Sequence, residues 1–243
     1  MNSEYDKYYG TTKFDNELSL IPHFTLYPEM KPWIGNNYGH GSPKILILGE
    51  SYYFNEDKAP HLDDEKWYSR SHGDTLDTRR GHRVRYHISN AIDVSFKGGT
   101  HQIHQRINKN LLASKVNWLD KLPYNSIAYL NFFQRPALNK GKDSKEKRGL
   151  KATALDQEVA AKTISQTINI INPDLVLFAS VLAYNVAMTK GVLKGTMTKH
   201  NYSPHPCTKW WSQNVKKYGK FKNENMGPIT GKRRFLEVLN QMV

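Results

Sequence analysis

Four apolar segments limit what this chain can fold into. The clearest runs from Lys44 to Gly49, and two more cover residues 126–131 and 174–179. A weaker and more polar segment covers residues 196–202. Because the first three are continuously apolar rather than alternating with polar residues, they predict parallel strands covered on both faces of a sheet.

Helical patterns separate these segments. Apolar residues recur at helical spacing over residues 102–113 and 155–171, and shorter helices are expected over 181–188 and 233–242. The alternation predicts an α/β fold: three layers, α/β/α, with a central four-stranded, mainly parallel sheet. A chain of 243 residues suits a single domain over residues 1–243. The sequence shows no clear element at about residues 55–100, which we interpret as a long basic insertion.

The net charge points to a polyanionic partner. Thirty-five Lys and Arg residues oppose 22 Asp and Glu residues, which gives a formal charge of +13. Such a field favours nucleic acid, although a generic basic surface would look the same. The sequence shows no signal peptide and no membrane span, and its lone cysteine, Cys207, fits a reducing compartment, so we expect a cytoplasmic protein. In the insertion we expect DNA contacts from Arg79, Arg80, Arg83 and Arg85.

Polar residues follow three of the predicted strands, where doubly wound sheets place their sites. Glu50 follows the first strand and could orient a water molecule. Asn131 ends the second strand and offers a donor and an acceptor to a base edge. His205 lies between two prolines and could donate to a developing anion. We therefore expect an acid, an amide and an imidazole around one pocket.

These segments, in this order, resemble the uracil-DNA glycosylase superfamily. Gly49-Glu50 is similar to the first motif of the branch that begins with Gly-Glu, and Asn131 precedes Arg135-Pro136 as in that branch. Residues 171–179 resemble the family's third strand, which is entered through a proline. His205-Pro206-Cys207 resembles the final His-Pro-Ser motif, with Cys207 in place of Ser. The cysteines of that branch's iron–sulfur cluster are absent, and no cofactor or metal is expected.

The resemblance implies a monofunctional DNA glycosylase that flips out a damaged or modified pyrimidine and leaves an abasic site. Glu50 and His205 would be catalytic, and Asn131, Tyr52, Tyr53 and Phe132 would bind the base. The target is uracil by default, or a hypermodified phage base such as glucosylated hydroxymethylcytosine, which implies antiviral defence. The partner is single- or double-stranded DNA, with no obligate protein partner. Further DNA contacts are expected from Ser51, Arg135, Lys209, Trp210 and Trp211.

The residues also allow structural roles. Glu50 and Asn131 could cap backbone, His205 could hold a loop, and the aromatic residues could fill the core. At the level of the whole chain, the alternatives are a DNA-binding module that senses a base without cutting and a metal-dependent nuclease.

Overall fold

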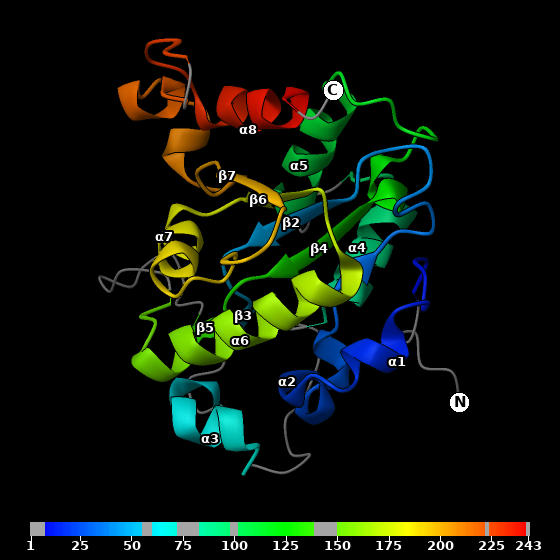
Figure 1. The fold of residues 1–243 in the computed structure, drawn as a ribbon, viewed down its shortest axis with the longest axis vertical. Helices are drawn as coiled ribbons and strands as arrows, with labels where there is room; N and C mark the ends of the chain where they lie inside the picture. The colour runs from blue at the N-terminus through cyan, green and yellow to red at the C-terminus, as the bar shows by residue number, and fades with distance from the viewer. Residues whose placement is uncertain are drawn as a thin grey trace.

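The computed structural model describes residues 8–54, 60–71, 83–97, 102–138, 150–221 and 224–241. Within these residues the chain has a mixed α/β fold around one five-stranded sheet, with a separate two-stranded sheet beside it (Figure 1). In spatial order the strands of the large sheet are β1 (Trp33–Ile34), β4 (Ile127–Asn131), β2 (Ile45–Gly49), β6 (Leu175–Phe178) and β7 (Lys199–Tyr202). The small sheet pairs β3 (Tyr53–Phe54) with β5 (Ala137–Leu138).

The four predicted strands are present and run parallel to one another. All residues of β2 and β6 are buried, as their continuous apolar sequences predict. The predicted number of strands was wrong, because β1 adds an antiparallel edge strand beside β4. With only two residues, β1 is too short to leave an alternating pattern, and it is anchored by Trp33, whose indole Nε1 donates to the Tyr124 carbonyl over 2.9 Å.

The helices form two groups on opposite sides of the large sheet (Figure 1). One group packs around α6, which contacts α1, α2, α3 and α7. In the other, α5 contacts α4 and α8. This arrangement is compatible with the expected α/β/α layers. The bounds are α1 (Asp15–Leu18), α2 (Pro22–Leu26), α3 (Asp64–Ser69), α4 (Val84–Asp93), α5 (Gln102–Leu112), α6 (Ala154–Ile171), α7 (Val181–Thr189) and α8 (Gly231–Asn240), with 3₁₀ turns η2 (Pro28–Met30), η3 (Pro60–Leu62), η6 (Pro123–Ser126), η7 (Lys209–Trp211) and η8 (Lys216–Gly219).

The predicted helices are confirmed to within two residues at each end. The longest, α6, begins at a capping box in which the Thr153 hydroxyl accepts from the Asp156 backbone N–H and the Asp156 carboxylate accepts from the Thr153 N–H. It ends at Asn172, which adopts a left-handed conformation just before Pro173. No helix in the described ranges is both long and apolar enough to cross a bilayer.

The prediction that about residues 55–100 form an insertion without clear elements was partly wrong. Its described residues form η3, α3 and α4, and α4 places Val84, Ile88 and Ala91 in the hydrophobic core. These three apolar residues recur at helical spacing, but basic and polar neighbours dilute the pattern. Residues 55–59, 72–82 and 98–101, which include Arg79 and Arg80, lie outside the described residues.

The strand order places a topological switch point at β2. The chain leaves β2 through α4 and α5 to reach β4, then crosses back through α6 to reach β6 on the other side of β2. In open parallel sheets, ligands bind in the crevice beyond the carboxyl end of such a strand. That crevice is where Glu50 leaves β2.

Candidate active site at the carboxyl edge of the sheet

The loops that follow β2, β4 and β6 are joined by backbone hydrogen bonds at this edge. Gly49 of β2 is paired in register with Asn131 of β4. Just beyond, the Phe133 N–H donates to the Glu50 carbonyl over 2.9 Å, and the Ala179 N–H donates to the Leu48 carbonyl over 2.7 Å. The residues after each strand are therefore held in fixed positions relative to one another.

The Asn131 side chain lies directly against Gly49. A Cβ atom added at Gly49 would stand 2.1 Å from Asn131 Oδ1 and 2.3 Å from Tyr129 Oη, closer than real Cβ atoms approach. The Tyr129 hydroxyl donates to Asn131 Oδ1 over 3.2 Å. Glycine at position 49 thus leaves the space in which the amide of Asn131 is oriented.

Glu50 is half-buried and held by a residue from a different strand end. Its Oε2 accepts a hydrogen bond of 2.7 Å from the Ser180 hydroxyl. Ser180 is also the N-cap of α7, because its Oγ accepts from the Ala183 N–H over 3.2 Å. The carboxylate therefore sits beside the N-terminus of a helix, where a negative charge is favoured.

His205 lies in the loop after β7. Burial lowers the pKa of His205, the negative charge of Glu50 opposes this, and the positive charge of Arg106 adds to it. The Cys207 N–H donates to Nδ1 over 3.2 Å, so the neutral ring carries its proton on Nε2. The site thus holds a neutral imidazole with a defined donor near a carboxylate.

Arg106 and Ser180 are site residues for which the sequence predicted no role. Arg106 projects from α5, and its Nη1 donates to the Pro206 carbonyl. Arg106 is not one of the apolar residues that recur along that helix. From the sequence alone it would therefore be placed on the polar, solvent-facing side. Ser180 directly follows β6, and its position after a strand was the only signal available.

The two tyrosines after Glu50 differ in exposure. Tyr52 is buried. Its pKa is raised mainly by this burial and to a smaller extent by the neighbouring Tyr129. Tyr53 is half-buried. Its pKa is raised mainly by burial and to a smaller extent by the negative charge of Glu50. The charge of Glu50 thus acts on Tyr53, whereas Tyr52 belongs to the hydrophobic core, which argues against its predicted role in binding the base.

The side chains of Phe132 and Arg135 are buried, which contradicts two predicted roles. Phe132 has no exposed surface and packs edge-on against Phe133 with ring centroids 5.0 Å apart, so it is a core residue rather than a base-stacking one. Arg135 forms a buried two-pronged ion pair with Asp156, with N–O distances of 2.8 and 2.6 Å. Its guanidinium also donates to the His61 carbonyl over 2.7 Å, so it is not available to a phosphate.

The remaining predicted DNA contacts fall into three groups. Ser51 and Trp211 are buried, Trp211 against Phe235 of α8, and Arg85 is paired with Asp15; these three are structural in this fold. Arg83 is half-buried, and Arg79 and Arg80 lie outside the described residues. Lys209 and Trp210 are exposed, with the Lys209 ammonium 4.4 Å from the centre of the Trp210 ring.

Two cavities lie elsewhere. One of about 570 Å³ is at the amino ends of β6 and β7, opposite to Glu50, and is lined by Asp174 and Lys199 among others. The other, of about 440 Å³, lies between α1 and α6. Neither contains a residue of the carboxyl edge. Among the described residues, no three His, Cys, Asp or Glu side chains gather closely enough to hold a metal ion.

No protein-family model matches this chain, and no curated protein matches it by sequence.

Proposed function

We propose that this chain is a monofunctional DNA glycosylase, which hydrolyses the bond between a base and its deoxyribose. The observation that carries the proposal is the grouping of Glu50, Asn131 and His205, which come from three strand ends far apart in the sequence. Gly49 is in register with Asn131, and the negative charge of Glu50 acts to raise the pKa of His205.

The chemistry of the reaction fits a carboxylate at one side of the site and an imidazole at the other. When the glycosidic bond breaks, its electron pair leaves with the base, and the sugar gains oxocarbenium character at C1′. The Glu50 carboxylate, fixed by Ser180, stabilises that cation. It also accepts a proton from the water whose oxygen bonds to C1′.

The leaving base is stabilised from the other side of the site. The lowered pKa of His205 keeps the imidazole neutral near pH 7, and its Nε2–H donates a hydrogen bond to the anionic base. Arg106 holds the backbone of the same loop at Pro206 and places a positive charge close by. The departing base takes its proton from solvent, Glu50 releases to solvent the proton that it took from the water, and the imidazole ends the cycle unchanged.

Recognition of the base would come from Asn131, whose amide can both donate and accept. The Tyr129 hydroxyl holds one end of that amide, which fixes its direction. The substrate class we propose is a damaged or modified pyrimidine: uracil, or a hypermodified phage base such as glucosylated hydroxymethylcytosine in an antiviral role. The formal charge of +13 supports DNA as the polymer that carries this base.

Two substitutions test the proposal. Glu50→Gln and His205→Ala should bind an oligonucleotide carrying the target base about as tightly as wild type does, but form abasic sites at least about 100-fold more slowly. Glu17→Gln and His40→Ala, which change exposed residues far from the carboxyl edge, serve as matched controls. A wild-type protein that binds DNA and releases no base from uracil-containing or hypermodified DNA would instead support a base-sensing module.

A further inference from the structure

A basic lobe follows the loop of His205. We define it as the described part of residues 208–233: it comprises η7, η8 and the first turn of α8 (Figure 1, orange to red). Two isolated bridges, Val215 with Ile229 and Lys220 with Asn225, close its loops on themselves. Its regular structure is limited to these short 3₁₀ turns and the start of α8.

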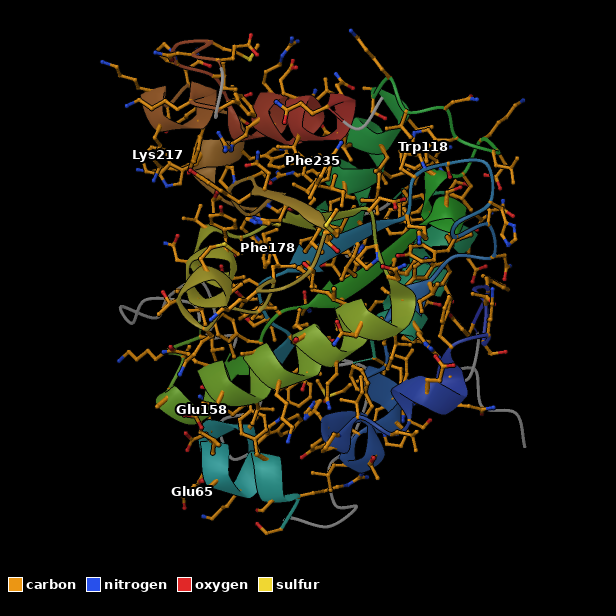
Figure 2. All side chains as sticks on the ribbon, viewed as in Figure 1. Glu65, Trp118, Glu158, Phe178, Lys217 and Phe235 are labelled. Atoms are coloured by element: carbon orange, nitrogen blue, oxygen red, sulfur yellow. The ribbon has the colours of Figure 1, made fainter. Side chains whose placement is uncertain are left out.

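The charge of this lobe is strongly one-sided. Residues 208–233 contain six lysines and one arginine but a single acidic residue, Glu224. In Figure 2, Lys217 lies at the outer margin of the molecule. Within the described part of the lobe, the exposed cations are Lys209, Lys216, Lys217, Lys220, Lys232 and Arg233. Arg233 is paired with Glu237, which leaves the lysines as the main source of the positive field.

The lobe is fixed relative to the His205 loop. At Gly231, the first residue of α8, an added Cβ would lie 2.1 Å from Pro204 and 2.9 Å from the Trp210 carbonyl oxygen. Arg234 is buried, and its guanidinium donates to the carbonyl of Tyr202 over 2.7 Å and to that of Tyr218 over 2.8 Å. The same guanidinium stacks on the rings of Tyr202 and Phe221, at 4.2 and 4.6 Å. One side chain thus ties the lobe to the end of β7.

The lobe also carries an aromatic side chain at the end nearest to His205. Trp210 is 41% exposed, although tryptophan is normally buried. The Lys209 ammonium over its ring pairs a cation with a flat apolar face. This combination suits nucleic acid, whose phosphates bind the cation and whose bases stack on the ring.

We propose that the lobe binds the sugar-phosphate backbone of the DNA strand beside the extruded nucleotide. The proposal rests on the proposed function for the position of the base, but the binding that it predicts needs no cleavage. Because Gly231 and Arg234 fix the lobe against the His205 loop, phosphates bound by Lys216, Lys217 and Lys220 would hold the duplex in one register over Glu50. Lys232, at the start of α8, would extend this contact toward the Trp210 side.

The test compares two variants of equal charge. The lobe variant changes Lys216, Lys217, Lys220 and Lys232 to Gln, and the control variant changes Lys115, Lys121, Lys194 and Lys199 to Gln. The control lysines are also exposed, but they lie at the opposite, amino edge of the sheet. The affinity of each for an unmodified duplex of about 20 base pairs, long enough for several phosphate contacts, is measured over a range of salt concentrations. Circular dichroism checks the folding of both variants.

The lobe variant should bind at least about 10-fold more weakly than wild type at moderate salt. Its salt-dependence slope should become shallower by roughly 0.9 for each phosphate that the protein no longer neutralises. The control variant should stay within about 3-fold of wild type. Equal weakening in both variants would show a general charge effect and overturn the proposal. So would unchanged DNA binding by a folded lobe variant, including the case in which that variant loses binding to anionic lipid vesicles instead.

The outcomes separate this proposal from the proposed function. Lobe-dependent DNA binding by a protein that releases no base would contradict the glycosylase and support the lobe. Base release by a protein whose DNA binding does not depend on the lobe would support the glycosylase and contradict the lobe proposal.

Discussion

The Ser180 hydroxyl donates a hydrogen bond of 2.7 Å to the Glu50 carboxylate, although 130 residues separate the two in the sequence. The same hydroxyl oxygen caps α7. A single side chain therefore links the start of a helix to the orientation of the proposed catalytic carboxylate, and the two roles can be separated by substitution.

Ser180→Ala should lower the rate of base release by about 10-fold, because a hydrogen bond to a charged group contributes roughly 1.5–3 kcal/mol and only part of it acts on the transition state. It should also lower the free energy of unfolding by about 1 kcal/mol, because the helix cap is removed. Ser180→Gly should lower the rate of base release by the same factor. It should lower the free energy of unfolding by only a few tenths of a kcal/mol, since glycine is tolerated at N-caps. Single-turnover rates and urea unfolding measure the two effects. If the more stable of the two variants also kept more activity, the loss of activity would come from the loss of stability, which would contradict a specific role for this hydrogen bond.

Arg106→Gln should lower the rate and move the acidic limb of the pH–rate profile to higher pH. The reason is that Arg106 lowers the pKa of His205, so its removal raises that pKa and the imidazole gains its proton at a higher pH. Arg106→Lys, which keeps the charge, should leave the limb close to its wild-type position. A slower rate without any movement of the limb would reduce Arg106 to a purely structural partner of Pro206.

Gly49→Ala should inactivate by displacing Asn131 rather than by unfolding the protein. The added methyl group would stand 2.1 Å from Asn131 Oδ1. We expect Gly49→Ala and Asn131→Ala each to reduce base release, and the double variant to be no worse than the more damaging single one. This double-mutant cycle, measured as kcat/KM, detects the coupling of neighbouring residues. Additive effects would mean that the glycine acts through something other than the amide.

How far the sequence predicts this molecule depends on whether a signal is local. The continuous apolar runs of β2 and β6 and the helical spacing of α6 are local, and those elements lie where expected. Glu50, Asn131 and His205 follow strands, and the topology of a parallel sheet brings strand ends together. Their position at one edge of the sheet could therefore be predicted.

Features that depend on a distant partner could not be predicted. Arg135 looks like a DNA-binding residue until Asp156, 21 residues away, is seen to pair with it in the core. Phe132 and Trp210 are both aromatic residues near a motif, but Phe132 is fully buried and Trp210 is exposed, which only packing decides. Arg106 reaches the site from a helix with no motif. Strand β1 has two residues, fewer than any periodic pattern needs.

His61 should make the stability of the fold depend on pH. It is fully buried, and burial, with a smaller effect of Arg135, lowers its pKa from 6.5 to about 4. The unfolded chain then binds more protons than the folded one between these values, so the free energy of unfolding falls as the pH drops from about 6.5 to about 4. The decrease from this group is up to about 3 kcal/mol and levels off below about pH 4.

Urea unfolding at several pH values measures this effect. His61→Phe, which cannot titrate, should show a flatter dependence between about pH 6.5 and about pH 4 than wild type. The exposed-site control His40→Gln should keep the wild-type slope. Parallel curves for wild type and His61→Phe would show that folding does not shift the pKa of His61.

The identity of the bond that is broken tests the central claim most directly. Purified protein is incubated with uracil-containing DNA and with phage DNA that carries hypermodified cytosine, and the small molecules released are identified by mass spectrometry. The polymer is examined in parallel for alkali-labile sites. The account predicts a free base from one of these DNAs, with one abasic site for each base released, and neither product with Glu50→Gln. Release of nucleotides, or strand breaks without abasic sites, would contradict it.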